Sequence, residues 1–264
     1  MRRKLLHVIV AAGLAGLAAC KDNTSPAALF NETTLTNDVA ASSGDEMATA
    51  VNSLTGDETT VGMSAPTVGF NLFGNAADFS RIRTCYDSAG AAVAGCSPLS
   101  SVRQIVTTAA LNTTRSDSVT VTGGGTIAFS GAVHRAADDT LTRNFVSGSE
   151  VSRTHSGLQT SHDTTTFSSS TVSRTHDEAA VDSIRGVTWN VPRLSHRFPI
   201  SGYIVRVDTV HATFTSATAT ESRTEVKVVK VTFPPIDAEG NVTLTIDAKS
   251  CTLNLGTHRV SNCH

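Results

Sequence analysis

Aromatic side chains are scarce in this chain, which has one tryptophan and two tyrosines among its 264 residues. Proteins that bind sugars or nucleic-acid bases commonly stack them on aromatic rings, so the scarcity argues against both classes. Blocks of like charge are also missing, and the formal net charge is only -2. Nucleic-acid binding requires a basic footprint, and docking on anionic lipid requires a polybasic segment. The charge pattern therefore excludes nucleic acid as the expected partner.

Motifs that carry catalysis are missing as well. The chain has no Gly-x-Ser-x-Gly elbow, no Ser-x-x-Lys and no P-loop, and its carboxylates are too scattered to suggest an acid/base pair. The glycines at 123–125 lie between predicted strands and predict a turn. The oxygen-rich segment 237–241 lacks the distal glutamate of a calcium-binding loop and also predicts a turn. We expect no catalytic activity and no cofactor.

The N-terminus carries the sharpest signal. Three basic residues follow Met1, an apolar run extends over residues 5–19, and the run ends in Leu17-Ala18-Ala19-Cys20. A basic start, an apolar stretch and small residues at a cleavage site are typical of a secretory signal peptide. The run is shorter than the roughly 20 residues that a membrane-spanning helix needs.

The cysteine after the small residues resembles a bacterial lipobox, and the chain is similar to uncharacterised β-rich envelope lipoproteins of environmental Gram-negative bacteria. The general sequence pattern around Arg81-Ile82-Arg83-Thr84-Cys85 adds to the similarity. The resemblance implies cleavage after residue 19 by the type II route and attachment of diacylglycerol to Cys20, with no activity attached. The alternatives are ordinary cleavage elsewhere and an N-terminal membrane helix.

By resemblance to the sorting rules of enterobacterial lipoproteins, the absence of aspartate directly after Cys20 favours the outer membrane. We therefore expect the cell envelope, with the domain facing either the periplasm or the exterior. Loss of residues 1–19 removes the three positive charges of Arg2, Arg3 and Lys4, which takes the net charge from -2 to -5. We expect this mildly negative net charge to serve mainly the solubility of the mature chain.

Four cysteines remain after Cys20, and an even number in an exported chain indicates disulfides. Their close spacing predicts the pairs Cys85–Cys96 and Cys251–Cys263. A zinc site would need close Cys-x-x-Cys pairs, which are absent.

The segment after the lipobox is polar and predicts a tether over residues 20–42, followed by one β-rich domain over 43–264. Ser43 and Glu46 match a capping box, which predicts a short amphipathic helix near residues 44–55 that ends at Gly56. Threonine and valine dominate the remainder, and such β-branched residues favour strands.

Strand patterns are clear at 79–85, at 119–133 around the triple glycine, and throughout the C-terminal third. A long strand is expected over 203–215. A phase change in the alternation between Val228 and Val229 predicts a β-bulge. Val242, Leu244 and Ile246 alternate with polar residues. This alternation predicts a strand with one buried and one solvent-exposed face, as in antiparallel sheets.

The middle of the chain, residues 134–180, is poor in large apolar residues and predicts an exposed sheet extension or partial disorder. It contains an internal repeat, in which Val-Ser-Arg-Thr-His occurs at 151–155 and again at 172–176. The period of 21 residues fits successive hairpins. His155, His162 and His176, with Asp163 and Asp177, could be drawn as a transition-metal cluster. Because their spacing has no ligand pattern, we expect surface histidines and no metal.

The sequence thus predicts a mainly β fold: an antiparallel sheet of hairpins, as a meander, a sandwich or an open half-barrel, with one short N-terminal helix. The first functional hypothesis is a non-catalytic, lipid-anchored envelope protein that binds or spaces other envelope components. The second is a carrier that holds an apolar ligand in a curved sheet. The third is a metal-dependent enzyme that uses the repeat histidines.

Overall fold

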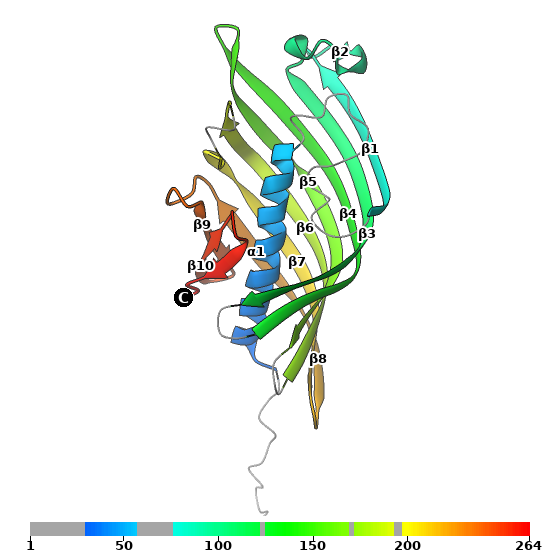
Figure 1. Ribbon diagram of the computed structural model, residues 1–264, viewed down its shortest axis with the longest axis vertical. Helices are drawn as coiled ribbons and strands as arrows, with labels where there is room; N and C mark the ends of the chain where they lie inside the picture. Colours follow the sequence, from blue (N-terminus) through cyan, green and yellow to red (C-terminus); the bar gives the residue numbers. More distant parts are fainter. Residues whose placement is uncertain (1–29, 57–75, 122–124, 169–171, 193–196) are drawn as a thin grey trace, which may run out of the picture.

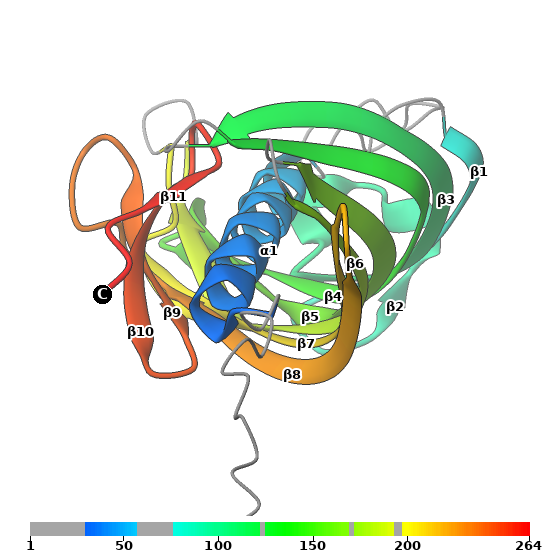
Figure 2. The same cartoon turned by 90° about the horizontal axis from the view of Figure 1, so that it is seen from below.

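The fold is a single open antiparallel sheet of eleven strands that curves around one helix (Figures 1 and 2). The computed structural model describes residues 30–56, 76–121, 125–168, 172–192 and 197–264. The order of the strands across the sheet follows the chain, apart from β1 and β2, which exchange places at one edge. The fold class predicted from the sequence is therefore confirmed, in its open and not its sandwich form.

The strands are long in the centre of the sheet and short at its edges. Their bounds are β1 Ala76–Tyr86, β2 Ala92–Val93, β3 Gln104–Val121, β4 Gly125–Val146, β5 Ser149–Ser168, β6 Val172–Asn190, β7 Ser201–Ser216, β8 Thr220–Thr232, β9 Asn241–Ile246, β10 Lys249–Asn254 and β11 Arg259–Ser261. Two short 3-10 helices, Ala94–Cys96 and Leu99–Ser101, lie between β2 and β3. β3 and β4 pair antiparallel up to Val121 and Gly125, and a turn precedes β9, both as predicted; the glycines at 123 and 124 lie outside the described residues.

The helix α1 (Glu32–Gly56) starts twelve residues before the expected position and lies in the concavity of the sheet (Figure 2). Asn31 caps it, because the Asn31 side chain accepts a hydrogen bond from the backbone N–H of Thr34 at 3.0 Å. Ser43, expected to be the cap, lies inside the helix. The expected tether over 20–42 is therefore helical from Glu32 onward, whereas residues 20–29 lie outside the described residues. Serine, threonine and asparagine give this stretch low helix propensity, so packing on the sheet stabilises it.

One side of α1 completes an apolar core with the C-terminal half of the sheet. Gly44 lies at the closest approach, where a Cβ atom would come within 2.4 Å of Val260 Cγ2. The core residues from α1 recur at helical spacing, and those from β6–β10 alternate along their strands. The core is formed by Leu35, Val39, Ala40, Met47, Ala48, Val51, Ile184, Val187, Trp189, Ile204, Val210, Ala212, Phe214, Val229, Val231, Phe233, Val242, Leu244, Ile246, Cys251, Leu253 and Leu255, joined by Phe30.

Two sequence expectations about the strands are wrong. Wherever the structure describes them, residues 134–180 form regular parts of β4, β5 and β6 with a buried inner face, and not the exposed sheet extension or partial disorder that the sequence predicts. No bulge separates Val228 from Val229, because they pair with the consecutive residues Val207 and Arg206 of β7. Both errors have one cause: the inner face of these strands carries charged side chains, so polarity does not mark the outside here.

Both predicted disulfides are present. Cys85–Cys96 ties β1 to the first 3-10 helix, and Cys251–Cys263 ties β10 to the C-terminus. A second link joins the same ends, since the backbones of Ser250 and His264 exchange two hydrogen bonds of 3.0 Å. The bond at the C-terminus thus holds a short edge strand that would otherwise fray.

We predict that replacing Cys251 and Cys263 together with serine lowers the free energy of unfolding by about 2–4 kcal/mol, because the closed loop no longer restricts the unfolded chain. Urea denaturation followed by circular dichroism measures the loss. Non-reducing peptide mapping of the unmodified protein serves as the control. A Cys85–Cys251 linkage in that map would contradict the pairing.

Candidate functional site

The strongest concentration of chemically active side chains lies between α1 and the inner face of β5–β7. We call this set the polar band. It consists of Ser161 and Asp163 on β5, Glu178 and Asp182 on β6, and Arg206 and Asp208 on β7. All six are buried, and the strand register places Asp163 directly opposite Glu178 and Asp182 directly opposite Arg206. Alternation along each strand therefore brings charged groups from three neighbouring strands into one layer.

Arg206 is the cation at the centre of the polar band and is 0% exposed. Its guanidinium donates to Asp182 Oδ2 at 3.1 Å, to Asp208 Oδ2 at 3.4 Å and to Ser161 Oγ at 3.2 Å. The neighbouring carboxylates outweigh the effect of burial and raise the pKa of Arg206 further above its usual value. Arg206 is thus a permanent charge that needs its carboxylate partners.

Glu178 lies among other carboxyl groups, and its Oε1 is 3.8 Å from His176 Nδ1. Burial, and then the charges of Asp208 and Asp163, raise the pKa of Glu178 well above its ordinary value, so this carboxyl favours its protonated form. Ser42 of α1 donates to both Glu178 oxygens, at 3.1 and 3.3 Å. Glu178 therefore holds a proton in the folded protein at pH values where a free glutamate is ionised, and it contacts the helix.

Further polar contacts fasten α1 along its length. Arg174 of β6 donates to both oxygens of Asp38, at 2.5 and 3.1 Å, and burial raises the pKa of Asp38 to about 6 although Arg174 acts in the opposite direction. Lys227 of β8, buried on the inner face, pairs with Glu32 in the first turn. The helix is thus bound by apolar contacts on one side and by ion pairs on the other.

The repeat histidines are buried and not on the surface as expected. His155 is 1% exposed and His176 is 0% exposed. His155 pairs with Val187 on β6, eleven residues along the strand from His176, so the two rings lie roughly 35 Å apart along the sheet. The repeat therefore marks two separate positions of the inner face and not one cluster.

Each repeat histidine has its own surroundings. His155 Nδ1 lies 2.9 Å from Asp139 Oδ2, and its ring meets the Trp189 ring edge-on with centroids 5.5 Å apart. His176 lies against Phe167, with centroids 4.8 Å apart. Burial, and then Arg174, lowers the pKa of His176 to about 3, so this ring is neutral at physiological pH.

His162, the third candidate, points away from both. It lies on the outer face of β5, where its Nε2 is 3.0 Å from Asp177 Oδ1 and both side chains are half exposed. Asp163, by contrast, belongs to the polar band. Among the described residues, no group of three or more histidine, cysteine, aspartate or glutamate side chains is arranged to hold a metal ion.

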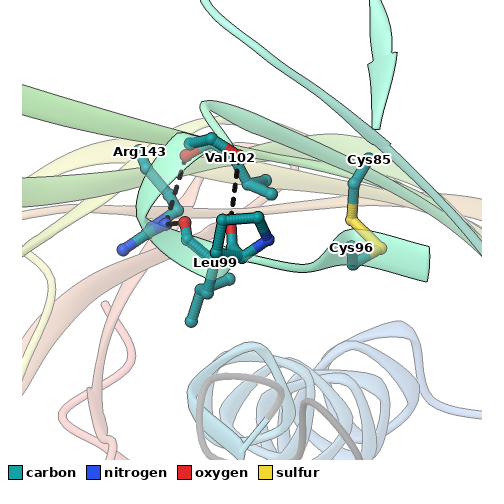
Figure 3. Close-up of a disulfide and its surroundings, with 7 residues drawn as sticks. Cys85, Cys96, Leu99, Val102 and Arg143 are labelled. Atoms are coloured by element: carbon teal, nitrogen blue, oxygen red, sulfur yellow. Dashed lines mark hydrogen bonds between the residues drawn. A yellow bond between two sulfur atoms is a disulfide. The ribbon is translucent and has the colours of Figure 1, made fainter. Parts of the chain in front are cut away.

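A second ionic cluster braces the segment between the first disulfide and β3 (Figure 3). The Arg143 guanidinium donates to the backbone carbonyls of Leu99 and Val102, the latter at 3.1 Å, and its Nη2 donates to Glu150 Oε2 at 2.6 Å. Burial would raise the pKa of Glu150, but Arg143 and Arg153 outweigh it and lower this pKa to about 2. Arg143 Nε also donates to Glu150 Oε1, at 3.0 Å, so its guanidinium joins a carboxylate to two backbone carbonyls and the cluster is a structural brace.

Sequence reasoning did not identify the polar band, although a signal was present. In β7, Arg206 and Asp208 alternate with Val205 and Val207, and either set could face inward. Assigning the valines to the core is the ordinary choice. In this sheet the charged set faces α1, whose Ser42 and Ser43 donate hydrogen bonds to Glu178 and Asp208.

The described part of the chain contains no helix that is long and apolar enough to cross a membrane. Residue Cys20 lies outside the described residues. Searches for similar proteins found no matching family model, no matching curated protein and no matching solved structure.

Proposed function

We propose that this chain is a non-catalytic cell-envelope protein, anchored in the outer membrane by a lipid on Cys20, which binds or spaces other envelope components. The observation that supports the proposal is the position of α1. The helix begins twelve positions after Cys20 and is embedded in the concave face of the sheet (Figure 1). An anchor on Cys20 is thereby connected directly to the rigid part of the domain.

The length of the connection limits the distance between membrane and domain. The segment between Cys20 and Glu32 reaches at most about 40 Å when fully extended. Its folded end is held at the β7–β8 end of the sheet, because the Phe30 backbone N–H donates to Glu221 at 3.1 Å and the Phe30 ring lies 5.0 Å from that of Phe214. In this proposal the β7–β8 turn faces the membrane, and the β4–β5 turn at the opposite end faces away.

We predict that the Cys20→Ser variant loses its membrane attachment, because the thiol that carries the lipid is gone and the apolar segment is too short to span. Phase partitioning in a detergent that separates on warming measures this, with the unmodified protein as the control. A variant that stays in the detergent phase, with its N-terminal segment still attached, would contradict lipid anchoring.

The orientation can be tested separately on the lipidated protein in vesicles. Single cysteines introduced at Thr218, in the β7–β8 turn, and at Ser149, next to the β4–β5 turn, carry a fluorescent label. A quencher attached to lipid headgroups is expected to quench the label at position 218 more strongly. Equal quenching at both positions would contradict this orientation while leaving the anchor itself intact.

A carrier of an apolar ligand is the second candidate, because the sheet curves around a helix as such carriers require. The polar band places charged side chains on the concave face, where an apolar ligand would have to bind. It therefore argues against the carrier and leaves the non-catalytic anchored protein as the first candidate. Mass spectrometry of organic extracts from the purified protein distinguishes the two. One lipid species in stoichiometric amount, beyond any attached to Cys20, supports the carrier.

A further inference from the structure

The alternation of side chains is inverted across the middle of β6, β7 and β8. In an ordinary antiparallel sheet the apolar residues face the core and the polar ones face water. Here Asp182, Asp208 and Lys227 face inward and are buried, whereas their chain neighbours Val181, Val207 and Val228 face outward. These three valines are 43–45% exposed. The apolar face of this band is therefore its outer face.

The outward valines form a continuous row. Val181 pairs directly with Val207, and Val207 pairs directly with Val228, so they occupy one line across three neighbouring strands. Val226 on β8 and Leu158 on β5 widen the row and are 60% and 47% exposed. Contiguous exposed apolar surface in the centre of a sheet is typical of an interaction site. We call these five residues the valine row.

We propose that the valine row is a self-association surface that contacts the same row of a second copy of this chain. The arrangement of charged residues on the outer face of β6 indicates that the partner is a second copy of the chain. Asp177 and Arg185 lie on the outer face at four residues on either side of Val181, each about 14 Å from it along the strand. The surface thus carries opposite charges at equal distances from its centre.

A two-fold axis along the valine row brings these charges together. The rotation lays β6 of one copy over β6 of the other with reversed direction, so Arg185 of each copy faces the partner's Asp177, and Val207 lies next to its own equivalent. Such an isologous contact is the commonest way in which identical chains associate. A second copy of the chain matches this arrangement of charges by symmetry, whereas a different protein would match it only if its own charges were placed in the same way.

The contact is expected to be weak. The outer face of the sheet is convex, as Figure 2 shows, so two copies touch only along the row and its flanks. The contact is smaller than that of permanent dimers, and we expect a dissociation constant of about 10–100 µM. The dimer would therefore form when the chain is locally concentrated.

Sedimentation velocity of the Cys20→Ser protein without detergent, over a concentration series up to about 500 µM, tests self-association. We expect a monomer–dimer equilibrium that Val207→Glu weakens at least tenfold, since it buries a charge at the axis. Thr243→Glu, on the exposed outer face of β9 and away from the row, is the matched control. A protein that stays monomeric throughout the series, or a dimer that Val207→Glu leaves unchanged, would overturn the proposal.

A charge exchange tests the two-fold geometry without touching the valines. Arg185→Asp and Asp177→Arg are each expected to weaken the dimer, because each places like charges opposite one another. The double variant restores the opposite pairing and should recover most of the association, although the His162–Asp177 contact is lost in it. Melting temperatures close to that of the unmodified chain show that all variants fold. A double variant no better than the single ones would refute this arrangement.

Discussion

Replacing Arg206 with alanine is expected to lower the free energy of unfolding by about 3–5 kcal/mol, the range for removal of one partner from a buried ion pair. Arg206 is fully buried, and its guanidinium is the cation that contacts Asp182 and Asp208. Without it, the carboxylates of Asp182 and Asp208 lose this cation in a layer of low dielectric constant. Guanidinium chloride denaturation monitored by Trp189 fluorescence measures the change.

Two controls separate charge from packing. Arg206→Met keeps most of the apolar stem and removes the charge, so it should be nearly as destabilising as alanine. Arg223→Ala breaks a pair with Glu221 of 2.8 Å whose arginine is 48% exposed, and it should cost less than about 1 kcal/mol. If Arg206→Met were as stable as the unmodified protein, the polar band would not depend on its central cation.

Glu178→Gln is expected to remove a pH dependence of stability that the unmodified protein shows. Because the pKa of Glu178 is raised on folding, the folded state retains a proton that the unfolded state releases above about pH 4.5. The stability from this group is fully present below pH 4.5 and is lost as the pH rises toward the pKa of the folded state. The slope for one proton is at most about 1.4 kcal/mol per pH unit.

Asp38 and His176 also make the free energy of unfolding depend on pH, mainly at lower pH values than Glu178. Asp38, with a pKa raised to about 6, also loses its contribution as the pH rises between about 4 and 6. His176, with a pKa lowered to about 3, acts oppositely: its contribution is present above pH 6.5 and is lost as the pH falls. These effects partly cancel below pH 6.5, so the range above it isolates Glu178.

Urea unfolding of both proteins between pH 5 and 9 provides the test. The difference in stability, unmodified protein minus Glu178→Gln, should fall steadily with increasing pH. Glutamine keeps the shape of the side chain and can still contact Ser42, so packing is preserved. A difference that is constant over this range would show that Glu178 titrates normally.

Local rules made the buried face of β9 and the two disulfides predictable. Val242, Leu244 and Ile246 are buried as their alternation with polar residues indicated, and both cysteine pairs join neighbours in the sequence. The helix was only half predicted: its end at Gly56 follows from the sequence, whereas its start at Glu32 does not. Residues 32–43 are poor helix formers, and their helix is stabilised by the surrounding sheet.

The sequence alone therefore determined that this chain is a mainly antiparallel β protein with two local disulfides, because alternation and short loop closures depend on neighbouring residues. Only the tertiary structure decided which face of the central strands is inside. For β6–β8 the sequence offers valines on one face and charges on the other, and the rule that charges face water selects the wrong one. A helix carrying Asp38, Ser42 and Ser43 in the concavity reverses the choice, because it supplies partners that water would otherwise provide.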